Sequence, residues 1–173
     1  MTAAADRAGA VVWVTGLPSS GKSTLARRIR DRLRAAGRAA LLLDGDVVRA
    51  ALDPAPGYDE AGRAAFYATL GNLALAVAAE GLVAIVAATG HRRAFRDRVR
   101  SRAPRFVEVH VDVPPEACAA RDPKGLWARA RAGGAPALPG AGVAYEPPLA
   151  PEVVARGGED GAAVERVAAA LSA

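Results

Sequence analysis

The sequence has few aromatic residues, a single cysteine and no long uncharged apolar segment, and each scarcity excludes a class of protein. Aromatic residues make up 5% of the 173 residues, so stacking platforms for nucleic-acid bases are scarce. Cys118 cannot form an internal disulfide, which is typical of the reducing cytoplasm, and we expect it to be a small buried helix residue. No apolar stretch reaches about 18 uncharged residues, so we expect no membrane span.

Positive charge is in excess, but its distribution does not favour a nucleic-acid partner. The net charge is +5, and arginines crowd into residues 27–38 and 92–105, where the helical spacing of apolar residues indicates solvated helix faces. Residues 1–9 lack the apolar core of a signal peptide. We therefore expect no membrane partner, no specific nucleic acid and a cytoplasmic protein. The length and the 51% hydrophobic content predict a single domain over residues 1–173.

Lysine is also rare, since only two of the 23 basic residues are lysine. Lys22 lies in Gly16-Leu17-Pro18-Ser19-Ser20-Gly21-Lys22-Ser23, the full G-x-x-x-x-G-K-[ST] phosphate-binding motif. Residues 10–14 before it form an apolar run that predicts a strand, and residues 23–33 after it have helical apolar spacing. A compact ammonium on a flexible stem suits phosphate contact, which fits the retention of lysine here.

The order of strand, glycine loop and helix predicts a site for a nucleoside triphosphate. Backbone N–H groups and the positive end of the helix would hold the β-phosphate. Lys22 would reach the β- and γ-oxygens, and the Ser23 hydroxyl would face Mg²⁺. The residues expected to bind ATP are Gly16, Ser19, Ser20, Gly21, Lys22, Ser23 and Thr24.

Alternating strands and helices predict an α/β fold with a parallel sheet covered by helices on both faces. Further strands are expected at 39–43, 82–87, 105–111 and 152–154, and further helices at 47–52, 59–80, 92–102, 114–120, 126–132 and 162–171. Ligands of such sheets bind beyond the carboxyl ends of the strands, where Gly16, Asp44, Asp46, Gly90 and Asp112 are expected.

Residues 123–151 are rich in glycine and proline and contain one short helical stretch. A stretch of this kind inside a compact domain is more often a functional lid than a linker. We therefore expect a lid over about residues 123–142 that orders when nucleotide binds.

Together these motifs resemble the adenylyl-sulfate kinase (adenosine 5′-phosphosulfate kinase) family. The resemblance covers nearly the whole chain and rests on GLPSSGKST at 16–24, LDGDVVR at 43–49, GY at 57–58, FVEVHVDVPPEACAARDPKGLWARARAG at 106–133 and YEPP at 145–148. The phosphate loop is common to many kinases, whereas the second and fourth motifs are much more specific. The resemblance implies a three-layer P-loop kinase fold with a five-stranded parallel sheet, a mobile lid and a homodimer. It also implies Mg²⁺-dependent transfer of the γ-phosphoryl group of ATP to the ribose 3′-hydroxyl of adenylyl sulfate.

The resemblance also implies roles for single residues. Asp46 would accept the proton of the acceptor hydroxyl, while Asp44 would support the metal's water shell or orient its neighbour. Lys124 and Arg121 would close over the transferring phosphates. The residues implied in binding the acceptor nucleotide are Asp46, Arg49, Tyr58, Arg63, Arg93 and Leu138.

The sequence departs from the family pattern where the acceptor nucleotide would bind. Val47 and Phe66 stand where the family has asparagine, and Gly90 stands where it has serine. Tyr58 keeps one aromatic face of the family's adenine clamp, and Leu138 replaces the other. These departures leave open a different acceptor, such as the cytidine diphosphate amidate used by a related branch.

Two readings from other classes remain open at this stage. The first is a nucleotide-binding regulatory protein that has lost turnover. The retention of Lys22, Ser23, Asp46 and Lys124 argues against it, because such decay usually removes charged catalytic groups. The second is a nucleic-acid-binding module that uses the basic helices. Binding that is lost at moderate salt and shows no sequence preference would be a nonspecific charge effect.

Overall fold

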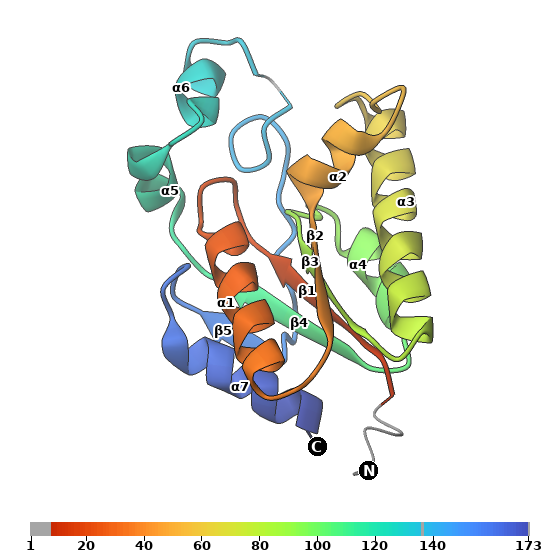
Figure 1. The fold of residues 1–173 in the computed structure, drawn as a ribbon. Helices are drawn as coiled ribbons and strands as arrows, with labels where there is room; N and C mark the ends of the chain where they lie inside the picture. Colours follow the sequence, from red (N-terminus) through yellow and green to blue (C-terminus); the bar gives the residue numbers. More distant parts are fainter. Residues whose placement is uncertain (1–7, 136, 173) are drawn as a thin grey trace, which may run out of the picture.

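Five parallel strands form one sheet with the order β2-β3-β1-β4-β5 (Figure 1). The computed structural model describes residues 8–135 and 137–172, so Pro136 of the predicted lid and the ends of the predicted 1–173 domain lie outside the described residues. The strands are β1 Ala10–Thr15, β2 Ala40–Asp44, β3 Val83–Ala87, β4 Phe106–Val111 and β5 Val153–Ala155. The sheet confirms the predicted five-stranded parallel arrangement.

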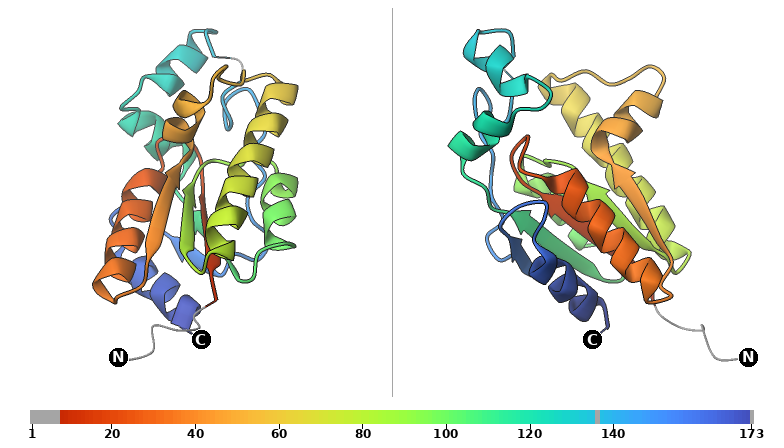
Figure 2. Two further views of the ribbon diagram at one scale, coloured as in Figure 1. Left: turned by 45° about the vertical axis from the view of Figure 1, so that its right-hand side comes forward. Right: turned by 60° about the vertical axis from the view of Figure 1, so that its left-hand side comes forward.

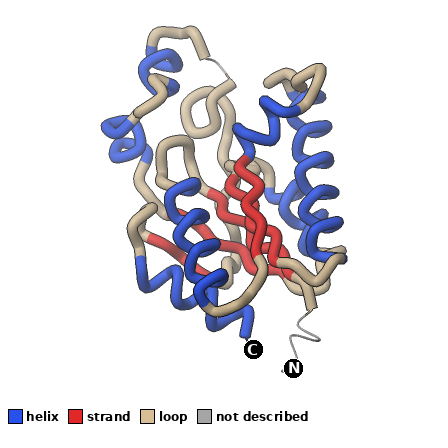
Figure 3. Tube along the Cα trace, in the orientation of Figure 1, coloured by secondary structure: helices blue, strands red, loops and turns tan. Residues whose placement is uncertain are grey.

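Helices cover both faces of the sheet, which gives three layers (Figures 2 and 3). The described helices are α1 Lys22–Ala35, α2 Gly45–Ala51, α3 Glu60–Ala79, α4 Arg93–Arg100, α5 Pro115–Arg121, α6 Leu126–Arg131 and α7 Gly161–Ser172. Helices α1 and α7 pack on one face and α3 and α4 on the other, while α5 and α6 lie beyond the carboxyl ends of the strands. The expected elements are confirmed, with boundaries within two residues.

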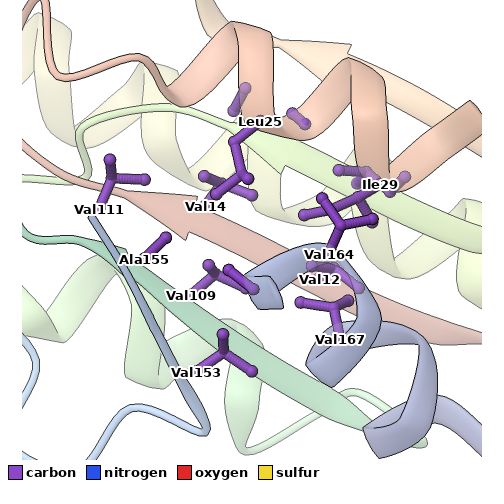
Figure 4. Packing of buried hydrophobic residues seen from close by; sticks show 14 of the residues in the cluster. Val12, Val14, Leu25, Ile29, Val109, Val111, Val153, Ala155, Val164 and Val167 are labelled. Atoms are coloured by element: carbon purple, nitrogen blue, oxygen red, sulfur yellow. The ribbon is translucent and has the colours of Figure 1, made fainter. Parts of the chain in front are cut away.

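The central strand β1 is buried on both faces because its side chains alternate between two cores. Val12 and Val14 pack in the cluster that includes α1 and α7 (Figure 4), while Val11 and Trp13 pack in the cluster that includes α3. Cys118 of α5 is fully buried, as expected for a small helix residue. None of the helices within the described ranges combines the length and the apolar composition needed to cross a bilayer.

One arginine of the basic helix α4 does not lie on a solvated face. Arg96 is 1% exposed, and its Nε donates to Glu108 of β4 at 2.6 Å. Its two terminal nitrogens donate to the backbone carbonyls of Gly90 and Glu146. Arg96 thus joins the loop after β3 to the segment that follows the lid, and corrects the expectation that this arginine cluster is only a charged surface.

Candidate active site

The phosphate loop joins β1 to the uncapped N-terminus of α1. Gly21 is the N-cap residue, no side chain caps the helix, and its first turn has no acidic residue. By contrast, the side chains of Asp44 and Asp59 cap α2 and α3. The first backbone N–H groups of α1 therefore remain available, and with the helix dipole they form a site for an anion.

Two glycines of this loop are required by close packing. Gly21 has φ of 101°, and a Cβ there would lie 2.6 Å from the backbone nitrogen of Gly158. A Cβ on Gly16 would lie 2.8 Å from the carbonyl oxygen of Val111. Ser20 is fully buried, and its Oγ has no hydrogen-bond partner among the described residues. The loop therefore holds a compact shape that presents unpaired polar groups.

Lys22 brings a desolvated positive charge to the loop. Its Nζ donates to the carbonyl oxygen of Leu17 at 2.7 Å. Burial lowers the pKa of Lys22 to about 8, and the charges of Cys118, Asp46 and Asp44 only partly oppose that effect. A bound phosphate would stabilise the ammonium and raise this pKa again.

Asp44 links the phosphate loop to the next strand and helix. Its Oδ2 accepts a hydrogen bond from Ser23 Oγ at 2.6 Å, and its Oδ1 accepts one from the backbone N–H of Asp46 at 3.0 Å. Mg²⁺ in nucleotide sites is held by one or two protein oxygens together with phosphate oxygens and water. The hydroxyl of Ser23 and the carboxylate of Asp44 fit that donor set. Across residues 8–135 and 137–172, no three acidic, histidine or cysteine side chains form a metal-binding group by themselves.

Asp46 forms an ion pair with Lys124 of the predicted lid. The hydrogen bond to Asp46 is the main cause that raises the pKa of Lys124. The Lys124 and Asp46 side chains are 62% and 71% exposed, so solvent screens the pair and it contributes little to stability. Lys124 is thus placed beside the candidate base but is not fixed there.

Two side chains of the predicted lid, Trp127 and Leu138, pack near the phosphate loop. Trp127 of α6 donates from Nε1 to the carbonyl oxygen of Pro18 at 3.1 Å. Leu138 is 8% exposed and belongs to the same buried cluster as Trp127 and Leu17. Figure 1 shows α5 and α6 on one side of this end of the sheet and α2 on the other. The Leu138 side chain points into the cluster in this structure, and its role as a second face for the acceptor base stays a prediction.

Arg49 and Arg63 are buried cations that both lie near the ring of Tyr58. Arg49 is 9% exposed and Arg63 is 8% exposed. Arg49 Nη1 donates to the carbonyl oxygens of Pro56 at 2.7 Å and Gly57 at 3.1 Å. Arg63 donates to the carbonyl oxygens of Tyr58, at 2.7 Å, and Ala137. Neither arginine forms an ion pair with a carboxylate in the described ranges, so the two guanidinium groups have carbonyl acceptors there but no counterion.

Not every predicted acceptor residue joins this cluster. Tyr58 does, because the Arg49 guanidinium lies over its ring. Arg93 begins α4, and its side chain donates to the carbonyl oxygen of Pro147 at 3.2 Å. No hydrogen bond or ion pair among the described residues joins Arg93 to Arg49 or Arg63. Arg121 is exposed at the end of α5. Burial raises the pKa of the Cys118 thiol, and the positive charges of Lys22 and Arg121 oppose that effect.

Sequence reasoning did not single out two residues as contributors to this site. Trp127 lies within the predicted lid, and its place in an otherwise small and basic helix was the available signal. Phe66 was noted only as the loss of an amide, yet its ring lies under the Arg49 guanidinium, with Cζ 3.9 Å from the ring centroid. Arg49 is on α2 and Phe66 on α3, so no local spacing indicates this contact.

The lowered pKa of Lys22 predicts that binding of ATP weakens as the pH rises. Only the protonated ammonium pairs with phosphate, and its fraction in the free protein falls from about three-quarters at pH 7.5 to about one-tenth at pH 9.0. The Kd for ATP, measured by isothermal titration at constant salt, should therefore rise about eightfold over this interval.

Lys22→Arg is the matched control, because arginine stays charged across the interval and its Kd should not follow the pH. A wild-type Kd that is constant between pH 7.5 and 9.0 would show that Lys22 is not a desolvated phosphate ligand.

Comparisons with known proteins agree with this geometry. The family profile for adenylylsulphate kinase matches residues 8–156. The chain is 38% identical over 148 residues to the adenylyl-sulfate kinase of Rippkaea orientalis, covering 86% of this chain and 82% of the relative. It is 44% identical over 147 residues to the adenylyl-sulfate kinase of Citrobacter koseri, covering 84% and 73%.

A solved structure shares the architecture over almost the whole chain. The APS kinase CysC of Mycobacterium tuberculosis, solved in complex with AMPPNP and APS, superposes with a TM-score of 0.86 and 34% identity. The match covers 95% of this chain and 98% of that one. The residues matched by the profile include the phosphate loop, Asp44 with helix α2, and the predicted lid. The chain therefore belongs to the adenylylsulphate kinase family.

Proposed function

We propose that this protein transfers the γ-phosphoryl group of ATP to the ribose 3′-hydroxyl of adenylyl sulfate. The observation that carries the proposal is the position of α2. Asp44 caps this helix and accepts the hydrogen bond of Ser23, so α2 is tied directly to the phosphate loop. The same short helix carries Asp46 in its first turn and Arg49 one turn later. One rigid link therefore joins the phosphate site, the candidate base and an acceptor-binding cation.

The ATP side of the reaction rests on the phosphate loop. The free N–H groups of α1 and the Lys22 ammonium hold the β- and γ-phosphates and orient the γ-phosphorus toward the acceptor. Ser23 and Asp44 would hold Mg²⁺, which would supply positive charge to offset that of the phosphates. As the 3′-oxygen bonds to the γ-phosphorus and the bond to ADP breaks, Asp46 accepts the hydroxyl proton.

The acceptor side rests on the two buried arginines. A buried charge without a counterion is costly, so Arg49 and Arg63 favour a ligand that brings negative charge. Guanidinium groups match the oxygens of phosphate and sulfate groups, and adenylyl sulfate carries both next to its ribose. The same argument favours a nucleotide over a free nucleoside as the acceptor.

Lys124 changes partner during the reaction in this proposal. Its exposed pair with Asp46 is weak, so the greater negative charge of the ATP phosphates draws the ammonium away from the carboxylate. Arg121 adds a second lid charge. The exchange leaves Asp46 free to accept a proton, and closes the lid over the transferring group.

The departures from the family pattern at the acceptor site also fit a second acceptor nucleotide. Tyr58 is 62% exposed and offers a stacking face, while Leu138 is buried and offers little surface in this structure. A pyrimidine nucleotide, such as a cytidine diphosphate amidate, is therefore the second candidate. We also propose a homodimer, because the family is typically dimeric. The single cysteine and the scarcity of aromatic residues favour a cytoplasmic protein without a specific nucleic-acid partner.

A coupled assay of ADP release over a panel of acceptors tests the function directly. The panel holds adenylyl sulfate, cytidine and uridine diphosphate derivatives, simple nucleoside monophosphates and adenosine. We expect acceptor-dependent ADP release with the highest kcat/KM for adenylyl sulfate and none with adenosine. Lys22→Ala should abolish the signal while circular dichroism shows an intact fold.

A higher kcat/KM for a cytidine diphosphate derivative would move the assignment to the second candidate. Tight binding of ATP without ADP release for any acceptor would support a regulatory nucleotide-binding protein instead.

Asp46→Asn separates proton transfer from nucleotide binding. The amide keeps the shape of the side chain but accepts no proton, so we expect turnover to fall by about 10²–10⁴ while the Kd for ATP changes less than about tenfold. Asp44→Asn is the matched comparison, because Asp44 contacts Ser23 and should affect Mg²⁺-dependent ATP binding. Steady-state kinetics and titration of both variants decide the roles, and a far larger loss of turnover in Asp44→Asn would reverse them.

A further inference from the structure

Arg49 lies between two aromatic rings with opposite exposure. Its Cζ is 4.4 Å from the ring centroid of Tyr58 and 3.9 Å from that of Phe66. Tyr58 is 62% exposed, whereas Phe66 is 3% exposed. Both distances are within the range in which a cation is attracted to an aromatic face. The guanidinium is thus the middle layer of a stack that begins in the core and ends at the surface.

The buried end of the stack is held firmly by other rings. Phe66 packs edge-on against Tyr67 at a centroid distance of 5.3 Å, and Tyr67 stacks on Phe95 at 4.8 Å. The hydroxyl of Tyr67 accepts a hydrogen bond from the backbone N–H of Gly90 at 3.0 Å. Phe66 therefore occupies a fixed position on α3, and its ring face defines where a guanidinium above it can lie.

The exposed end of the stack depends on Arg49. Tyr58 lies in the loop between α2 and α3, and Arg49 Nη1 donates to the carbonyl oxygens of Pro56 and Gly57 in that loop. Arg63 donates from Nε to the carbonyl oxygen of Tyr58 itself. Because Arg49 holds the loop backbone and covers one face of Tyr58, the position of Arg49 determines where the exposed face of Tyr58 points.

We propose that Phe66 is a positioning residue of the acceptor site, which holds the Arg49 guanidinium against Tyr58 so that the exposed face of Tyr58 receives the base of the acceptor nucleotide. The inference rests on the proposed function and names a specificity element of that site. An asparagine at position 66 has no aromatic face and could not form this layer. Within the described ranges, no hydrogen bond, ion pair or ring contact joins Tyr58, Arg49 or Phe66 to residues 16–23, so we expect the stack to affect the acceptor and not ATP.

The test compares Phe66→Leu with the wild-type protein in steady-state kinetics. Leucine keeps an apolar side chain but removes the ring face. We expect the KM for adenylyl sulfate to rise about five- to twentyfold, with kcat and the KM for ATP within about twofold. A role in stability alone would lower the active fraction, and hence kcat, and would leave the KM for adenylyl sulfate unchanged. That second result would overturn the inference.

Phe106→Leu is the matched control. Phe106 also carries an arginine over its ring, Arg100, with Cζ at 4.6 Å from the centroid, but it begins β4 at the opposite end of the strands from the phosphate loop. The control loses the same kind of contact, and we expect both KM values to stay within about twofold of the wild type. A rise in the KM for adenylyl sulfate equal to that of Phe66→Leu would show a general effect of packing and contradict the inference.

A double-mutant cycle shows whether Phe66 acts through Arg49. In an Arg49→Gln background the guanidinium is absent, so Phe66→Leu should lower kcat/KM for adenylyl sulfate by less than about twofold further. If the two substitutions together lower kcat/KM for adenylyl sulfate by the product of their separate factors, Phe66 does not act through Arg49 and the inference fails. If Phe66→Leu does not fold, Phe66→Met, which keeps more of the volume without an aromatic face, takes its place.

Direct titration separates this inference from the proposed function. If the wild-type protein releases no ADP with any acceptor, the proposed function fails, and the Kd values for adenylyl sulfate and ATP are compared in the same variants. A selective loss of adenylyl-sulfate binding in Phe66→Leu would then support the stack alone. Absence of adenylyl-sulfate binding to the wild-type protein would refute both proposals.

Discussion

Buried positive charge at the carboxyl ends of the strands is the constraint on which the site depends. Arg49 and Arg63 are buried and Lys22 is partly buried. The three residues come from three different helices, and none forms an ion pair within the described part of the chain. Desolvated charge of one sign opposes folding, and burial lowers the pKa values of Lys22 and Arg63 accordingly. In the proposed function two anionic nucleotides offset this desolvation cost, and the uncompensated charge is the basis of their recognition.

The rest of the architecture brings these cations to one place. The parallel sheet aligns the ends of β1 and β2, so the hydroxyl of Ser23 meets the carboxylate of Asp44. Asp44 then sets the start of α2, which carries the proposed base Asp46 and the proposed acceptor ligand Arg49. Trp127 ties the predicted lid to the phosphate loop, so the loop proposed to hold ATP also holds the element proposed to cover it.

Local sequence patterns predicted the framework of this site because each depends on neighbouring residues. The phosphate motif, the apolar runs and the acidic pair after β2 each report a local geometry, and the structure confirms their elements. The burial of Leu138 and Arg96 could not be predicted, because it depends on how loops distant in sequence fold back onto the sheet. Phe66 shows the same limit, since comparison with a family pattern reveals a lost amide but not the guanidinium that covers the ring.

Thermal unfolding with and without ligands tests the central claim that anionic nucleotides offset the buried cations. A ligand at about a hundred times its Kd contributes about 2.7 kcal/mol, which raises Tm by about 5–10 °C for a chain of this size. We expect shifts of this order for ATP and for adenylyl sulfate, and none for adenosine at the same concentrations. Equal shifts with adenosine, or no shift with either nucleotide, would contradict the account.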